Sequence, residues 1–232
     1  MFKNDYKGKN HIILIGAGGT GGWFASFLHR IKDENIVTII DGDHVEQKNL
    51  SRQNFMQNDI DKNKAQAIGD RFEFDNIVPQ FLTNKDELKQ IVESIEGRPI
   101  IIGAVDNNGS RKLVHEFMTD YDKHAIWIDA GNTERDGQMI IHILDENGQT
   151  FEKFDSPINI YNEVFSNVEG DERRPDQISC AEQSESAPQN VAANVMSGTT
   201  LFVAVNKLLA GEPLFNNEIK FSSNMMTMVA TS

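Results

Sequence analysis

Cysteine is almost absent from this sequence: Cys180 is the only one in 232 residues. A disulfide within the chain and a four-cysteine zinc site are therefore excluded, and we expect no zinc. Basic residues are also scarce, since 22 lysines and arginines stand against 35 aspartates and glutamates, for a net charge of −13. A nucleic-acid-binding protein needs a basic surface that neutralises phosphates, so we expect no nucleic-acid partner.

Long apolar runs are missing as well. The most apolar stretch, residues 191–210, is interrupted by Asn194, Ser197, Asn206 and Lys207. This pattern is typical of a buried amphipathic helix and not of a membrane span. The first ten residues, MFKNDYKGKN, lack the apolar centre of a signal peptide. We therefore expect no membrane partner and a cytoplasmic location.

Strand and helix signals alternate over the first 130 residues. Apolar runs predict strands at 11–15, 36–40, 76–82, 99–105 and 125–129. Amphipathic segments between them predict helices at 21–31, 61–72, 85–92 and 110–121. Such alternation is typical of parallel strands joined by right-handed crossovers. The predicted fold class is α/β, with a Rossmann-like, mainly parallel sheet and helices on both faces.

The pattern changes after residue 130. Residues 137–144 follow the preceding strand without a helix, which predicts an antiparallel addition, and the segments EIKF and MMTMVA predict further C-terminal strands. Residues 145–187 have weak periodicity, and we expect a long irregular crossover-type loop there, within a single domain that spans 1–232. Pro188 is expected to open a long helix, whose predicted apolar side carries Val191, Val195, Phe202, Val205 and Leu209.

The stretch IILIGAGGTGGWFASFL is the clearest functional signal. Gly16, Gly18 and Gly21 match G-x-G-x-x-G between a strand and a helix, where glycines let the backbone approach a phosphate at the helix N-terminus. Asp41 stands at the end of the next strand, the position of an acid that binds ribose hydroxyls. NAD and ATP fit these residues equally well, and a glycine turn that only packs helix on strand is the alternative.

Two basic residues distinguish the nucleotides. Arg52 and Lys64 follow the second strand, and a triphosphate with a departing pyrophosphate needs such cations more than NAD does. The alternative places both residues on a solvated helix surface. Asp106 ends the fourth strand, where open α/β sheets place ligands, and its carboxylate is suited to Mg²⁺. The alternative at that position is a helix cap by Asp106 or Asn107.

Four motifs in order, GAGGTGG, DGDHVEQKNLSRQ, DKNKA and VDNNGSR, resemble the ThiF/MoeB-type adenylating enzymes, relatives of ubiquitin-activating enzymes. The likeness covers roughly residues 11 to 142. It includes NLSRQ eight residues after the first aspartate of D-x-D and Arg111 five residues after Asp106. The later segments DAGNTERDGQ and SCAEQSE resemble the ThiF members of PRTRC-type systems of bacterial plasmids and phages.

The resemblance implies a Rossmann-like sheet extended by antiparallel strands, usually in a homodimer. It implies transfer of AMP from ATP, with Mg²⁺, to the C-terminal glycine carboxylate of a small ubiquitin-like or sulfur-carrier-like protein. The nucleotide loop would comprise Gly16, Gly18, Gly19 and Gly21. The remaining implied roles are ribose binding by Asp41, phosphate contacts from Asn49 and Arg52, stabilisation of the α-phosphate and pyrophosphate by Lys64, and Mg²⁺ binding by Asp106. Asp43 and Gln53 belong to the same motif and are further expected nucleotide-binding residues.

Many relatives pass the activated acyl group to a cysteine on the crossover loop. Cys180 is the candidate here, and a buried, unreactive cysteine is the alternative. Two other functions remain open. A nucleotide-binding scaffold in a multiprotein system would bind ATP without catalysis, and an NAD-dependent oxidoreductase would need a catalytic acid that the sequence does not show.

Overall fold

The computed structural model describes residues 1–160 and 190–231. Eight strands form one sheet in the order β3-β2-β1-β4-β5-β6-β7-β8. The first five strands in this order, β3, β2, β1, β4 and β5, pair in parallel. The strands from β5 through β6 and β7 to β8 pair antiparallel. The strands are β1 (Asn10–Ile15), β2 (Ile36–Ile40), β3 (Asn76–Val78), β4 (Arg98–Gly103), β5 (Ala125–Asn132), β6 (Asp136–Leu144), β7 (Glu218–Ser222) and β8 (Thr227–Thr231). The predicted Rossmann-like sheet with an antiparallel C-terminal extension is therefore confirmed.

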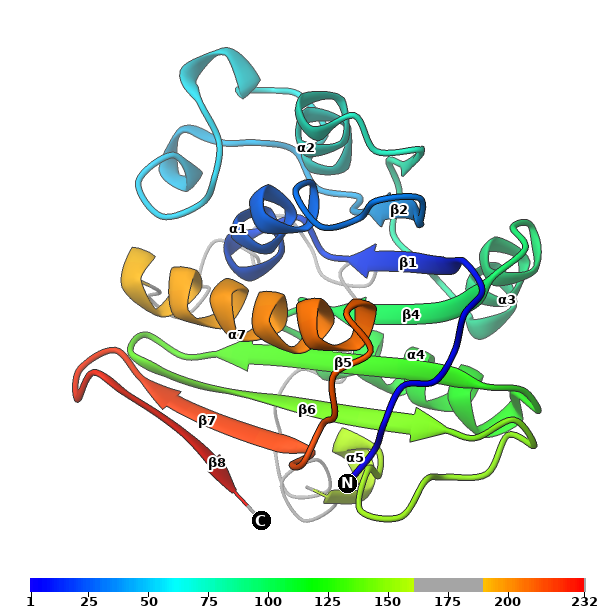
Figure 1. The fold of residues 1–232 in the computed structure, drawn as a ribbon. Coiled ribbons are helices and arrows are strands. Elements are labelled where there is room, and N and C mark those ends of the chain that lie inside the picture. The colour runs from blue at the N-terminus through cyan, green and yellow to red at the C-terminus, as the bar shows by residue number, and fades with distance from the viewer. Residues whose placement is uncertain (161–189, 232) are drawn as a thin grey trace.

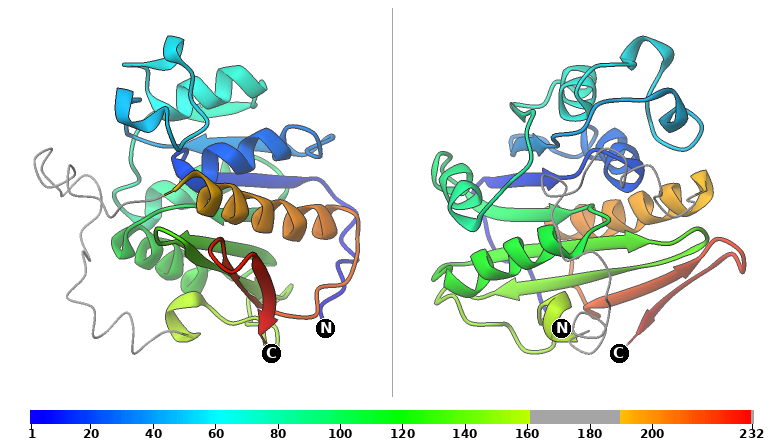
Figure 2. Two further views of the ribbon diagram at one scale, coloured as in Figure 1. Left: turned by 90° about the vertical axis from the view of Figure 1, so that its left-hand side faces the viewer. Right: turned by 180° about the vertical axis from the view of Figure 1, so that it is seen from behind.

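Helices lie on both faces of this sheet. Figure 1 shows α1 and α7 side by side on one face, with α3 and α4 on the other. The α-helices are α1 (Gly19–Leu28), α2 (Lys64–Phe72), α3 (Lys85–Glu93), α4 (Asn108–Asp120), α5 (Pro157–Ile160) and α7 (Val191–Leu209). Both views in Figure 2 keep α7 beside α1 although the two are far apart in sequence. No helix in the described part of the chain is long and apolar enough to cross a membrane.

The side chains of β1 show how the sheet separates two hydrophobic cores. Ile12 and Leu14 belong to the core under α1, α2 and α7, whereas Ile13 and Ile15 belong to the core under α3 and α4. Successive strand residues point to opposite faces, so a strand covered on both sides must be apolar throughout. This is why HIILI appears in the sequence as an unbroken apolar run.

The buried side of helix α7 agrees only in part with the predicted one, since Val205 is buried but Val191 is not. Val191 is 44% exposed, whereas the small residues Ala193, Ser197 and Gly198 are buried. A Cβ atom at Gly198 would lie 3.0 Å from the backbone nitrogen of Phe24, so α1 and α7 approach closely. Small residues therefore share the buried side of this helix with large apolar ones.

The segment predicted to be irregular, 145–187, is only partly described. Thr150 forms an isolated bridge with Leu144, and the short helix α5, which was not predicted, begins at Pro157. Residues 161–189 lie outside the described part of the chain, and Cys180 is among them.

Candidate functional site

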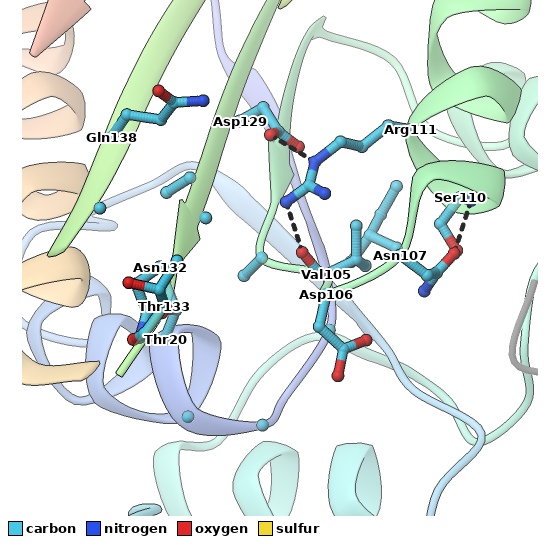
Figure 3. A pocket seen from close by; sticks show the side chains of 18 of the residues that line it. Thr20, Val105, Asp106, Asn107, Ser110, Arg111, Asp129, Asn132, Thr133 and Gln138 are labelled. Atoms are coloured by element: carbon cyan, nitrogen blue, oxygen red, sulfur yellow. Dashed lines mark hydrogen bonds and ion pairs between the residues drawn. The ribbon is translucent and has the colours of Figure 1, made fainter. Parts of the chain in front are cut away.

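A cavity of about 1000 Å³ opens at the carboxyl ends of β1, β2 and β4 and extends across β5 to β8. Its lining includes all but two of the residues predicted from sequence: Gly16, Gly18, Gly19, Asp41, Asp43, Asn49, Arg52, Gln53, Lys64 and Asp106. The exceptions are Gly21, which lies in the first turn of α1 outside the lining, and Cys180, which lies outside the described residues. Figure 3 shows part of this cavity.

The glycine turn is shaped by its first glycine. Gly16 has a φ of +95°, and a Cβ atom there would lie 2.5 Å from the carbonyl oxygen of Ala104. Residues with a side chain rarely adopt this conformation, so the turn from β1 into α1 requires glycine at this position. At Gly21 an added Cβ would lie 1.9 Å from the Gly16 oxygen, so this glycine serves the packing of the turn on the helix.

Asp41 fixes the glycine turn to the end of β2. One carboxylate oxygen accepts a hydrogen bond from the backbone N–H of Ala17 at 2.7 Å, and the other accepts one from the N–H of Asp43 at 2.8 Å. Burial raises the pKa of Asp41, while the nearby Lys64 cation opposes that rise. Asp41 was predicted only to bind ribose, but it also holds the glycine turn in place.

Lys64 is brought to the cavity by the capped N-terminus of α2. Asn63 caps the helix by accepting a hydrogen bond from the N–H of Gln66, and its side-chain amide donates to the carbonyls of Asp41 and Asp43 at 2.9 and 3.1 Å. Lys64 is the first helical residue, and its backbone N–H donates to Asp43 as well. The D-x-D and DKNKA motifs are therefore one folded unit.

The Lys64 ammonium group is buried against carboxylates. Its Nζ lies 2.8 Å from Oδ2 of Asp43. Burial acts to lower the pKa of Lys64, but the charges of Asp41, Asp43 and Asp106 outweigh it and raise the pKa above its usual value. Lys64 is thus a fixed positive charge beside the glycine turn.

The NLSRQ segment forms a tight turn on the same side of the cavity. It follows the 3-10 helix η1 (Gln47–Asn49), whose last residue, buried Asn49, accepts a hydrogen bond from the N–H of Glu46 at 2.8 Å. Arg52 is partly buried and lines the cavity. The neighbouring Gln53 is buried, and its Oε1 has no hydrogen-bond partner among the described residues. Buried polar atoms in folded proteins are normally satisfied, so this oxygen is available to a ligand.

Asp106 is exposed and lines the cavity, while the next residue caps the helix. Asn107 is the N-cap of α4 and accepts a hydrogen bond from the N–H of Ser110 at 2.8 Å. In Figure 3 the Asp106 carboxylate points away from the Arg111 side chain. The capping role therefore falls to Asn107 and leaves the Asp106 carboxylate for a ligand.

The carboxylate of Asp106 suits a metal ion that is bound together with a nucleotide. Within residues 1–160 and 190–231, no group of three or more His, Cys, Asp or Glu side chains could hold a metal ion. Mg²⁺ is commonly bound by one or two carboxylates together with phosphate oxygens and water. Asp106 fits that arrangement as one ligand to Mg²⁺ carried by a nucleotide.

An ion pair that the sequence analysis did not assign lies on the wall of the cavity next to β5. Arg111 Nε donates to Oδ2 of Asp129 at 2.8 Å, and its Nη2 donates to the carbonyl of Val105 at 2.6 Å (Figure 3). Burial raises the pKa of Asp129, an effect opposed by Arg111. Oδ1 of Asp129 has no hydrogen-bond partner in the described part of the chain. Arg111 was noted only as part of a motif, and the aspartate of AIWID carried no signal beyond its place at a strand end.

The profile of the ThiF family matches residues 7–231. A comparison with curated protein sequences gave no match.

Solved structures share the fold at low sequence identity. PaaA superposes with a TM-score of 0.67 at 18% identity, over 96% of this chain and 72% of PaaA. MccB from E. coli with ATP superposes with a TM-score of 0.66 at 17% identity, over 95% of this chain and 63% of MccB. The microcin C7 biosynthetic enzyme MccB in complex with N-formylated MccA gives a TM-score of 0.67 at 18% identity, over 95% of this chain and 64% of that enzyme. The chain thus spans less than two thirds of the MccB chains that it matches.

Proposed function

The chain belongs to the ThiF family, and we propose that it uses ATP to adenylate the carboxylate of a substrate. The observation that carries this proposal is the arrangement of Arg52, Lys64 and Asp106 around one cavity with the glycine turn. Two cations and a carboxylate beside a phosphate-binding turn suit a triphosphate. Binding of ATP is supported by the fold shared with MccB, of which a structure with ATP exists.

In the proposed reaction, a carboxylate oxygen of the substrate attacks the α-phosphorus of ATP. The bond from that phosphorus to the bridging oxygen breaks, pyrophosphate leaves, and an acyl adenylate forms. No proton has to move, because the nucleophile is already ionised. The protein's task is therefore to align two anions and to neutralise their charge.

The cavity residues divide this task. The turn at Gly16, Gly18 and Gly19 binds the nucleotide, Arg52 contacts the phosphates, and Lys64 stabilises the charge on the α-phosphate and the departing pyrophosphate. Asp106 would hold Mg²⁺, which when bound neutralises phosphate charge. Asn49 and Gln53 complete the contacts to the nucleotide. The substrate carboxylate that we propose is the C-terminal glycine of a small ubiquitin-like or sulfur-carrier-like protein, and the working unit is a homodimer.

Exchange of labelled pyrophosphate into ATP tests this function, in the presence of a ubiquitin-like protein that ends in Gly-Gly. Exchange that depends on the partner's intact C-terminus is the expected result. Removal of the two glycines is the matched control, and it should abolish exchange. ATP binding without exchange under any partner would instead support the nucleotide-binding scaffold, and NAD binding in place of ATP would refute adenylation.

A further inference from the structure

Asn194, in the first turn of α7, connects several walls of the cavity, and we propose that it is a positioning residue for Arg52. Its side chain is fully buried and does not belong to the cavity lining. This inference rests on the proposed function, because it concerns the arginine assigned to the phosphates of ATP.

The amide nitrogen of Asn194 fixes the backbone of Arg52. Nδ2 donates a hydrogen bond to the Arg52 carbonyl oxygen at 3.0 Å across 142 positions of sequence. The indole Nε1 of Trp23 donates to the same oxygen at 3.3 Å. Two donors from α7 and α1 therefore converge on one carbonyl at the base of the Arg52 side chain, and they restrict where that side chain begins.

The amide oxygen of Asn194 is used as well. It accepts a hydrogen bond from Nδ2 of Asn132 at 3.0 Å, and Oδ1 of Asn132 accepts one from the hydroxyl of Thr20 at 3.0 Å. Thr20 and Asn132 both line the cavity and lie close together in Figure 3. A continuous series of hydrogen bonds thus runs from the glycine-turn helix through β5 and α7 to Arg52.

The glycine turn leaves room for this amide. A Cβ atom at Gly19 would lie 2.5 Å from Nδ2 of Asn194 and 2.8 Å from its Oδ1. Any side chain at that position would displace Asn194 from its partners. The requirement for glycine at position 19 therefore arises from Asn194 of α7.

The position needs one donor and one acceptor on a short side chain, and asparagine supplies both. Aspartate would keep the acceptor for Asn132 but would bring a carboxylate to the Arg52 carbonyl oxygen, where a donor is required. Alanine would remove both hydrogen bonds. Each variant therefore removes one of the two donors to the Arg52 carbonyl without replacing a residue of the cavity lining.

The test compares affinities for ATP and AMP in Mg²⁺ buffer by isothermal titration calorimetry. We expect Asn194→Asp and Asn194→Ala to weaken ATP binding about tenfold, as loss of a hydrogen bond to a buried carbonyl would. AMP binding should change less than twofold, because Arg52 acts on the longer phosphate chain. Ser197→Ala is the matched control, since Ser197 is equally buried one turn later in α7 and its hydroxyl has no partner among the described residues.

A second variant and a spectroscopic signal separate positioning from general stability. Trp23→Phe removes the other donor to the Arg52 carbonyl and should give the same ATP-selective loss even if the Asn194 variants fail to fold. In ¹H–¹⁵N spectra, the indole signal of Trp23 should shift in Asn194→Ala and stay in place in Ser197→Ala.

Each outcome has one meaning. Unchanged ATP affinity in the folded Asn194 variants and in Trp23→Phe would overturn the positioning role while leaving the proposed function intact. Equal losses for ATP and AMP would also overturn it, because they would indicate a structural role only. A wild-type protein that binds no ATP would refute the proposed function, and the inference with it.

Discussion

Replacement of Lys64 by methionine separates the stabilising role of this residue from its proposed catalytic role. Methionine keeps most of the apolar length of the side chain and removes the charge. The Lys64 side chain is only 10% exposed and its ammonium lies 2.8 Å from Asp43, whose side chain is 39% exposed. Three acidic residues, Asp41, Asp43 and Asp106, lose their common cation in this variant.

The two expected effects differ in size. Breaking a fully buried ion pair costs about 3–5 kcal/mol. Solvent at Asp43 screens part of this pair, so we expect the free energy of unfolding to fall by about 1–2 kcal/mol. Loss of a preorganised charge at the reacting phosphate should lower pyrophosphate exchange by about 10²- to 10³-fold. The catalytic loss therefore exceeds what the loss of stability explains.

Urea unfolding and pyrophosphate exchange measure the two effects on the same preparations. Adding Asp43→Asn to Lys64→Met should restore part of the stability, because it removes a carboxylate left without its cation, while exchange stays low. Lys62→Met is the control: Lys62 stands two residues earlier with a 51% exposed side chain, and its loss should change neither quantity. Exchange by folded Lys64→Met within threefold of the wild-type rate would refute the role assigned to Lys64.

Three further predictions concern the glycine turn, acid stability and the cysteine. Gly16→Ala forces a side chain into φ +95° against the Ala104 oxygen, and urea unfolding should show a loss of about 2–4 kcal/mol; an unchanged midpoint would contradict the account of the turn. Burial lowers the pKa of three histidines from 6.5 to about 4, so the unfolded chain takes up their protons first as the pH falls. The histidines destabilise the fold only below pH 6.5, and solvent screening reduces the effect, so the free energy of unfolding should fall by on the order of 2 kcal/mol per histidine between pH 6.5 and 4; a flat profile would refute this for His11, His124 and His142. Cys180→Ala should leave pyrophosphate exchange intact and abolish any thiol-reducible adduct with the partner on a gel; an adduct that persists would remove Cys180 from the reaction.

The centre of the parallel half of the sheet could be predicted from sequence because β1, β2, β4 and β5 are almost wholly buried. A strand of this kind reads as a continuous apolar run, and the run Ile36–Ile40 coincides with β2. The buried side of α7 could be predicted only in part, because Val205 is buried but Val191 is exposed. Apolar periodicity marks the buried side of a helix when its neighbours are distant enough to need large side chains. At the closest approach of α1 that position is taken by Gly198 instead of a large side chain.

Part of the candidate site could also be predicted from sequence, and part could not. Residues at strand ends could be predicted to meet, because the carboxyl ends of parallel strands lie at one edge of the sheet. Asp41 and Asp106 could be predicted in this way, and Arg52 and Lys64 could be predicted from the motifs. It does not reach Asn194, whose partner lies 142 positions away. The only signal was a polar residue within an apolar helix, and it served merely to argue against a membrane span.

The charges in the cavity resolve an apparent conflict between an acidic protein and an anionic ligand. Three carboxylates on its wall that could repel a phosphate are already engaged: Asp41 by two backbone N–H groups, Asp43 by Lys64, and Asp129 by Arg111. The ion pairs hold Lys64 and Arg111 in place before a ligand arrives, so little reorganisation is needed when charge develops on a phosphate. They also mean that a phosphate must compete with Asp43 for Lys64. A phosphate group competes best with Asp43 when its negative charge is greatest. In the proposed reaction this is the transition state, where charge is spread over the α-phosphate and the departing pyrophosphate. An arrangement of this kind favours the transition state over tight binding of ATP itself.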